Sequence, residues 1–164
     1  MGILIGVSAL ILNEKNEVLL TKRHDLQIWV FPGGGINVAR EESPEQAIKR
    51  EVKEETGIKI KINRLAAVYL TDHPLRRGLN LFFLARKIAG KLKEQKGEVL
   101  EARWIKKENL DKFLSPRHYQ RFLDAVSGKE IILRVDRRFP LPLSKLPLFL
   151  WRRFLGKKLG LVKD

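Results

Sequence analysis

Three glutamates lie close together in the segment 50–58, which reads Arg-Glu-Val-Lys-Glu-Glu-Thr-Gly-Ile. On a helix, Glu51 is one turn away from both Glu54 and Glu55, so the three carboxylates project from one face. Like charges this close repel one another unless a cation lies among them. Oxygen ligands of this kind suit Mg²⁺ or Mn²⁺ better than zinc. The spacing predicts a divalent-metal site, although an ordinary solvated helix face would show a similar pattern.

A glycine-rich turn precedes this helix, in the stretch 29–35 that reads Trp-Val-Phe-Pro-Gly-Gly-Gly. Glycine allows the backbone to approach a phosphate closely or to expose a carbonyl oxygen to a metal ion. Gly33, Gly34 and Gly35 are therefore candidates for contacts with a substrate or a metal. A glycine triplet alone is a weak signal, and its position just ahead of the glutamates gives it weight.

Taken together, these residues resemble the Nudix box of the MutT-like hydrolases, whose pattern is G-x5-E-x7-R-E-U-x-E-E-x-G-U with U an aliphatic residue. From Glu42 onward the match is complete, with seven residues before Arg50 and with Gly57 and Ile58 at the end. The front half departs from the pattern, because six residues separate Gly35 from Glu42, or seven if Gly34 is the box glycine. An enlarged loop thus replaces a shorter turn.

The resemblance implies hydrolysis of a nucleoside diphosphate linked to another group X, by attack of water on phosphorus. Glu51, Glu54 and Glu55 would hold Mg²⁺, with Mn²⁺ as an alternative, and the glycine turn would supply a backbone ligand, for which Gly34 is the candidate. Metal ions neutralise phosphate oxygens and lower the pKa of the attacking water. Arg50 would orient a glutamate.

Further roles follow from the same resemblance. The partner of Arg50 would be Glu42. The general base would be either Glu54 or Glu98, with Glu101 in reserve. The alternative for Glu98 is an ordinary charged residue at the edge of a strand, without a catalytic role. Phosphate contacts are expected from the glycine turn and from the end of the second predicted strand. The candidates are Gly33, Gly34, Gly35 and Arg23, with Lys22 and His24 next to Arg23. For these three residues of the strand end, exposure to solvent without a ligand is the alternative.

The chain must supply a framework that positions these groups. Apolar runs bounded by turn residues predict strands over residues 3–12, 18–22, 59–70, 79–86 and 99–105, with a hairpin turn at 13–17. Two helices are predicted, Pro44–Thr56 and Pro116–Val126; the first has a capping box of Ser43 and Gln46 and a stop at Gly57, and Gly128 closes the second. These elements predict an α/β fold, and the resemblance implies a Nudix-type α/β/α sandwich with a mixed β-sheet over residues 1–128.

Composition sets outer limits on the protein. A length of 164 residues with 44% hydrophobic content fits one domain with its own core. The absence of cysteine excludes disulfides, thiolate zinc sites and cysteine nucleophiles, and we expect a cytoplasmic protein. The apolar run 3–12 lacks the basic lead of a signal peptide and is expected to be a strand, and no segment is long enough to span a membrane.

Positive charge is concentrated at the end of the chain. The net charge is +14, and residues 129–164 carry ten Lys or Arg against three Asp or Glu, which gives +7. Pro140, Pro142 and Pro147 predict no regular structure between Arg134 and about Leu148, after which a short amphipathic helix is expected in this basic C-terminal extension. That helix could pack on the domain or on a second subunit of a homodimer, or bind an anionic membrane peripherally.

The sequence leaves several substrates open. The compact length favours nucleoside triphosphates or dinucleoside polyphosphates. An ADP-ribose-type pyrophosphatase is the first alternative, because Pro74 lies where such enzymes often carry a proline, although they commonly have an extra N-terminal region. Removal of pyrophosphate from RNA 5′ ends is the second, because the basic surface suits a phosphate backbone. A nucleotide- or RNA-binding Nudix module without activity is the third, and the complete set of glutamates disfavours it.

Overall fold

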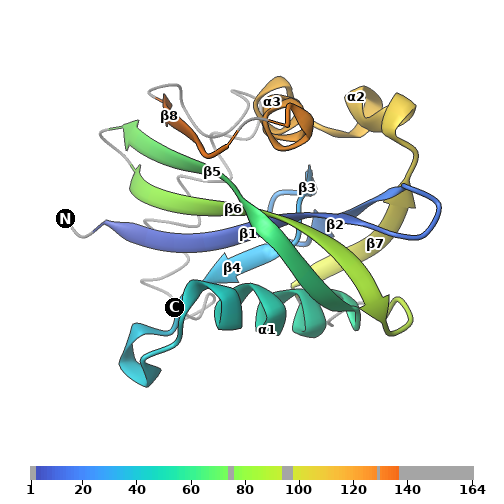
Figure 1. The fold of residues 1–164 in the computed structure, drawn as a ribbon, viewed down its shortest axis with the longest axis horizontal. Helices are drawn as coiled ribbons and strands as arrows, with labels where there is room; N and C mark the ends of the chain where they lie inside the picture. The colour runs from blue at the N-terminus through green and yellow to red at the C-terminus, as the bar shows by residue number, and fades with distance from the viewer. Residues whose placement is uncertain (1–2, 74–75, 94–97, 129, 137–164) are drawn as a thin grey trace.

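A mixed β-sheet built around β1 (Leu4–Leu12) forms the centre of the computed structural model (Figure 1). The structure describes residues 3–73, 76–93, 98–128 and 130–136, so Pro74 and the predicted helix after Leu148 lie outside it. The strand order is β3-β2-β1-β6-β5-β8, with β4 also paired to β1 and β7 to β2. The remaining strands are β2 (Val18–Arg23), β3 (Trp29–Val30), β4 (Gly33–Gly35), β5 (Lys59–His73), β6 (Arg76–Ala89), β7 (Val99–Ile105) and β8 (Ile132–Asp136).

The five predicted strands are all present, and three of them are longer than expected, β2 by one residue and β5 and β6 by more. Strands β5 and β6 pair antiparallel along their whole length, from Lys59 opposite Ala89 to His73 opposite Arg76. The pairing continues beyond the apolar runs because backbone hydrogen bonds, rather than side-chain burial, hold the polar ends together. Strand β6 also lies parallel to β1, with Leu4 opposite Gly78, which makes the sheet mixed.

The two predicted helices are present with the expected bounds, α1 (Pro44–Thr56) and α3 (Pro116–Val126). Ser43 and Gln46 form the predicted capping box of α1, and Gly57 ends the helix in the left-handed conformation with φ 72°. Sequence patterns missed five short elements that are too short to show a periodic apolar signal of their own, β3, β4, η1 (Val38–Arg40), η2 (Lys107–Asn109) and α2 (Leu110–Phe113).

Helix α1 covers one face of the sheet, and α2 and α3 cover the other, so the predicted α/β/α sandwich is confirmed (Figure 1). Side chains of β1 alternate between two cores, as the two-residue period of a strand requires. Val7 and Ile11 pack toward α1 with Ile48, whereas Leu10 packs on the other side with Phe122 of α3. Within the described ranges, no helix is long and apolar enough to cross a membrane.

Strand β8 was not predicted. It lies parallel to β5, from Ala67 opposite Ile132 to Thr71 opposite Asp136, and forms an edge of the sheet. The expectation of irregular structure from Arg134 onward was therefore wrong for the first residues of that segment. The reason is tertiary: a partner strand more than sixty positions earlier in the chain stabilises β8, and no local pattern reports it.

The carboxylate of Asp124 joins three elements on the α3 side of the sheet. This residue of α3 is 3% exposed. It accepts hydrogen bonds from the hydroxyl of Tyr69 in β5 at 2.8 Å, from Gln120 at 3.1 Å, and from Nε and Nη2 of Arg134 in β8, both at 2.7 Å. Burial of this charge is tolerated because several donors satisfy it.

Substitution of Tyr69→Phe should lower the free energy of unfolding by about 1.5 to 3 kcal/mol, since it removes one hydrogen bond to a buried charged group. The ring keeps its edge contact with Phe82 in the variant. Chemical denaturation of both proteins measures the difference. Tyr119→Phe is the matched control, because no hydrogen bond of the Tyr119 hydroxyl is found in the described structure; equal stability of all three proteins would contradict this account.

Candidate active site

Helix α1 presents Glu51, Glu54 and Glu55 to different surroundings. Its apolar residues Ile48 and Val52 are fully buried against the sheet, which fixes the rotation of the helix. With that rotation Glu51 and Glu55 are partly buried, whereas 48% of the Glu54 side chain is exposed. The packing of the apolar stripe therefore decides which carboxylates face the protein and which face solvent.

Strand β4 brings the glycine turn against these carboxylates. The backbone N–H of Gly33 donates a hydrogen bond of 3.1 Å to Oε2 of Glu55. A methyl group on Gly34 would lie 2.5 Å from the carboxylate of Glu51, so a side chain there would displace it. The carbonyl oxygen of Gly34 points away, toward Gly6 of β1. Its role as a metal ligand stays a prediction.

The guanidinium of Arg50 connects α1 to the enlarged loop. Its Nε and Nη2 donate to the two oxygens of Glu42 at 2.7 and 2.9 Å, so the predicted partner is in place. Nη2 also donates to the carbonyl of Gly35 at 3.0 Å. Nη1 donates to Glu51 at 2.8 Å and to Glu54 at 3.1 Å. All three nitrogens are thus used, and Arg50 holds two of the candidate metal ligands.

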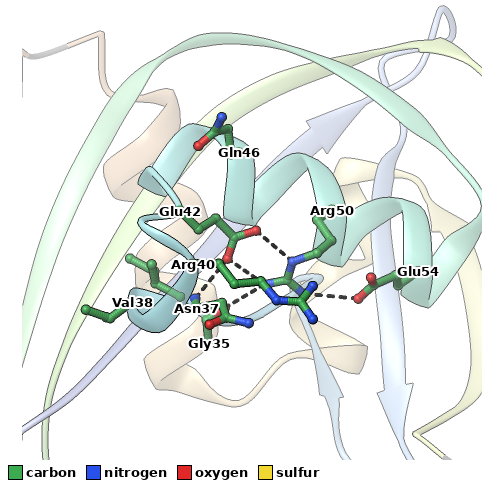
Figure 2. A pocket seen from close by; sticks show the side chains of 9 residues that line it. Gly35, Asn37, Val38, Arg40, Glu42, Gln46, Arg50 and Glu54 are labelled. Carbon is green, nitrogen blue, oxygen red and sulfur yellow. Dashed lines mark hydrogen bonds and ion pairs between the residues drawn. The ribbon is translucent and has the colours of Figure 1, made fainter.

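A pocket of about 840 Å³ opens between the enlarged loop and α1 (Figure 2). Its volume lies in the range of small-molecule binding sites. Charged and amide side chains predominate in its wall, and the residues that line it are Gly35, Ile36, Asn37, Val38, Arg40, Glu42, Gln46, Arg50 and Glu54. Because Glu54 is one of the three glutamates of the box, a molecule in this pocket would reach the candidate reaction centre.

The start of β7 brings Glu98 to the glutamates of α1. The N–H of His24, just after β2, donates to the carbonyl of Glu98 at 2.9 Å. The Glu98 carboxylate is close enough to raise the pKa values of Glu51 and Glu55. Arg23 lies in the same neighbourhood and pairs with Asp25, its Nη2 at 2.7 Å from Oδ2. Four parts of the chain that are far apart in sequence therefore meet here: β2, β4, α1 and the start of β7.

Glu101, the reserve candidate for the general base, is differently engaged. It hydrogen-bonds to Arg103 two residues later in β7. It lies opposite Lys22 of β2. The carboxylate that joins the site from β7 is thus Glu98 rather than Glu101.

Burial and like charge perturb the pKa values of the site carboxylates. Burial raises the pKa of Glu55 to about 8, and the negative charges of Glu51 and Glu98 add to the effect. Burial also raises the pKa of Glu51. Glu42 shows the opposite behaviour, because its hydrogen bonds to Arg50 and to the N–H of Asn37 lower its pKa to about 2. Negative charge is therefore costly at Glu55 and well compensated at Glu42.

The donor set suits a hard divalent cation. In the described part of the chain, no three Asp, Glu or His side chains converge closely enough to form a ready-made metal site. The negative charge of Glu51 nonetheless raises the pKa of Glu55, and those of Glu54 and Glu98 raise the pKa of Glu51, which is the situation that a cation relieves. All donors are oxygens, as Mg²⁺ and Mn²⁺ prefer. Ligation requires the side chains to turn toward one another, and the half-exposed Glu54 would have to give up its hydrogen bond to Arg50 to do so.

The site contains two features that the sequence patterns did not reveal. Asp25 pairs with Arg23, and only the close spacing of the two residues could have suggested it. Arg40 lines the pocket beside α1, and the only available signal was the extra length of the loop that carries it. The enlarged loop itself was recognised, whereas the direction of its side chains was not.

Comparison with known proteins settles the family. The family model described as "NUDIX domain" matches residues 3–125, which is most of the chain. The protein belongs to the Nudix family. It is a Nudix pyrophosphohydrolase, a hydrolase of phosphorus-containing anhydrides that acts on nucleotide-linked substrates. The match ends at α3, so it includes the box, the glycine turn and Glu98.

Relatives of this Nudix protein differ in how much of the chain they match. It is 28% identical over 125 residues to a putative 8-oxo-dGTP diphosphatase of Bacillus subtilis, covering 76% of this chain and 81% of that one. It is 46% identical over 71 residues to an RNA pyrophosphohydrolase of Haemophilus influenzae, covering 43% of this chain and only 34% of that one. Among solved structures, the MutT protein of Methanosarcina mazei is similar, with a TM-score of 0.63, 29% identity and coverage of 77% and 96%.

Gly34→Ala should reduce kcat/KM roughly ten- to a hundredfold, because the added methyl group displaces the Glu51 carboxylate from its position. Thermal stability should change little, since the atoms in contact are the end of a flexible side chain. Gly35→Ala is the control, because a methyl group there meets nothing within 4 Å. Steady-state kinetics and thermal unfolding of both variants test this; similar activity of Gly34→Ala and Gly35→Ala would contradict it.

Glu55→Gln should stabilise the metal-free protein at high pH. The folded-state pKa of Glu55 is about 8 against 4.5 for the free group, so the folded state binds more protons between these values. Wild-type stability therefore falls as pH rises through this window, whereas the variant carries no titrating group at the position. In EDTA, the variant should melt roughly 3 to 6 °C above wild type at pH 9 and close to it at pH 5. If the melting temperatures of the two proteins changed with pH in parallel, the effect of burial on Glu55 would be disproved. Addition of Mg²⁺ should remove the difference in melting temperature at pH 9.

Proposed function

We propose that the protein is a Mg²⁺-dependent hydrolase of nucleoside triphosphates or dinucleoside polyphosphates. The observation that carries the proposal is the meeting of Glu51, Glu55 and Glu98, from two distant parts of the chain, beside the guanidinium of Arg23. The negative charges of Glu51 and Glu98 raise the pKa of Glu55, which favours a divalent cation there, and the adjacent guanidinium favours a phosphate. The carboxylates thus suit the metal ion of a metal–polyphosphate complex, and the guanidinium suits its phosphates.

The metal would be held by Glu51, Glu54 and Glu55, and when bound it would neutralise phosphate oxygens and make the attacking water more acidic. The chain's own groups have separate tasks. Arg50 keeps the side chains of Glu51 and Glu54 in position through the hydrogen bonds of Nη1. Its simultaneous bonds to Glu42 limit its own movement.

Glu98 is the proposed general base. It is exposed, immediately precedes β7 and lies within electrostatic range of Glu51 and Glu55. An exposed carboxylate that is not a metal ligand can accept the proton of the attacking water. Glu54 is the alternative, but its hydrogen bond to Arg50 engages one of its oxygens. Arg23 would bind a phosphate of the substrate, for which it would have to share its guanidinium with Asp25.

The choice of substrate rests on the relatives that match most of this chain. The putative 8-oxo-dGTP diphosphatase matches 76% of it and supports a nucleoside triphosphate. The likeness to a Nudix domain of Shewanella oneidensis NrtR, whose structure contains ADP-ribose, is only 21% in sequence and supports the fold alone. ADP-ribose is therefore the less favoured substrate.

Removal of pyrophosphate from RNA 5′ ends is the second candidate function. A net charge of +14 favours binding of a polyanion, and the 46% identity to an RNA pyrophosphohydrolase falls in a 71-residue segment. The chain spans only about a third of that relative. An RNA substrate should show kcat/KM that falls steeply with salt, whereas a free nucleotide should show a shallow dependence.

Hydrolysis should be measured by phosphate and pyrophosphate release from nucleoside triphosphates, dinucleoside polyphosphates, ADP-ribose and 5′-triphosphorylated RNA, with Mg²⁺ or EDTA. We expect turnover only with Mg²⁺. Glu98→Gln should lower kcat by about 10² to 10⁴ without changing the affinity for Mg²⁺, as loss of a general base does. Glu54→Gln should weaken Mg²⁺ binding.

Glu45→Gln is the matched control, because Glu45 is an exposed residue of α1 outside the site, and it should retain wild-type turnover. If Glu54→Gln lost turnover with unchanged Mg²⁺ affinity while Glu98→Gln stayed active, the base would be Glu54. Turnover in EDTA, or none with any of these substrates, would overturn the proposal.

A further inference from the structure

The enlarged loop between β4 and α1 has a defined conformation. Residues 38–40 form the 3₁₀ turn η1, and Glu41 follows in the left-handed region with φ 53°. The N–H of Asn37 donates to Oε2 of Glu42 at 2.8 Å, and the N–H of Arg40 donates to the carbonyl of Asn37 at 3.1 Å. Arg50 bonds the first residue of the loop, Gly35, and its last, Glu42. The extra residues are thus tied down at both ends.

Two guanidinium groups line the pocket, and they differ in their bonding. Every nitrogen of Arg50 donates to a carboxylate or carbonyl, so Arg50 cannot bind a ligand without losing a contact. Arg40 is exposed, and no side-chain hydrogen bond or ion pair of Arg40 is found in the described part of the chain. Figure 2 shows Arg40 extending into the pocket that Arg50 and Glu54 also line.

A cation in this position is suited to an oxyanion. A guanidinium presents its donors in a planar fork that matches phosphate, and here it lies in a pocket large enough for a phosphate chain. The other charged members of the wall, Glu42 and Glu54, are both hydrogen-bonded to Arg50. Arg40 lies within electrostatic range of Glu42 but forms no hydrogen bond with it in the described part of the chain, so its guanidinium donors remain available to an anion. Glu54 connects the same pocket to the box glutamates.

We propose that Arg40, supplied by the enlarged loop, binds the outermost phosphate of the substrate and so selects compounds with three or more phosphates in a chain. This inference rests on the proposed hydrolase function and narrows its substrate class. Nucleotides that carry a neutral sugar beyond their second phosphate do not offer Arg40 a partner. The loop insertion thus makes the site selective for polyphosphates over nucleotide sugars.

Steady-state kinetics of Arg40→Ala and Arg40→Lys test this on a nucleoside triphosphate and on ADP-ribose. We expect Arg40→Ala to raise KM for the triphosphate about tenfold or more with little change in kcat, as the loss of a charged hydrogen bond predicts. Arg40→Lys should recover part of the loss, because a point charge still attracts phosphate. The kcat/KM for ADP-ribose should not change in either variant.

Arg86→Ala is the matched control, because Arg86 is an exposed arginine of β6 outside the pocket, and its loss lowers the net charge equally. Equal KM values for Arg40→Ala and wild type, or equal losses for Arg40→Ala and Arg86→Ala, would refute the role of Arg40. The same variants can be compared by calorimetry of inorganic tripolyphosphate binding in the presence of Mg²⁺, which requires no turnover. If Arg40→Ala weakened this binding and Arg86→Ala did not, the role of Arg40 would be supported even if the wild-type protein hydrolysed no nucleotide. Absence of hydrolysis would then overturn the proposed function only.

Discussion

The charge balance around Arg50 is the interaction on which the site depends. One guanidinium neutralises the carboxylate of Glu42, just before α1, and that of Glu51 within the helix. It also donates a hydrogen bond to the carbonyl of Gly35 at the end of β4. Without it, Glu42, Glu51 and Glu54 would be neighbouring negative charges with no cation in common. The hydrogen bonds also connect both ends of the enlarged loop to the helix. In the proposed mechanism Arg50 is a positioning residue that acts through the glutamates it holds.

The sheet supplies the second constraint, because it determines where each charged group can emerge. Alternation along β1 directs one set of apolar side chains to α1 and the other to α3. The glycine strand β4 then fills the narrow space between β1 and α1 with backbone alone. Carboxylates of α1 are pressed against that backbone, which is why burial raises the pKa of Glu55 so far. The electrostatics of these carboxylates therefore depend on packing as well as on residue type.

Much of this arrangement follows from sequence. The exceptions are elements that depend on backbone pairing or tertiary contacts rather than on a local side-chain pattern. Helix α1 was predictable because its cap, first proline and terminal glycine are local signals. The five long strands were predictable from apolar runs. Strands β3, β4 and β8 were not, since β3 is only two residues long, β4 consists of glycines that pair through backbone only, and β8 depends on a distant partner. The approach of Glu98 to the box was anticipated from the family resemblance, whereas Arg40 depends on loop geometry that no pattern encodes.

The position of β8 changes what counts as the end of the folded unit. Residues 132–136 complete the sheet beside β5, and Arg134 neutralises the buried carboxylate of Asp124. A chain shortened at Gly128 would therefore lose more than a basic appendage. It would present the bare edge of β5, a long strand able to pair with other molecules, and it would leave a buried charge without its cation. A truncation that keeps residues through Asp136 removes positive charge while leaving the sheet edge covered, and only such a shortened protein can separate the contribution of the basic extension from that of the fold.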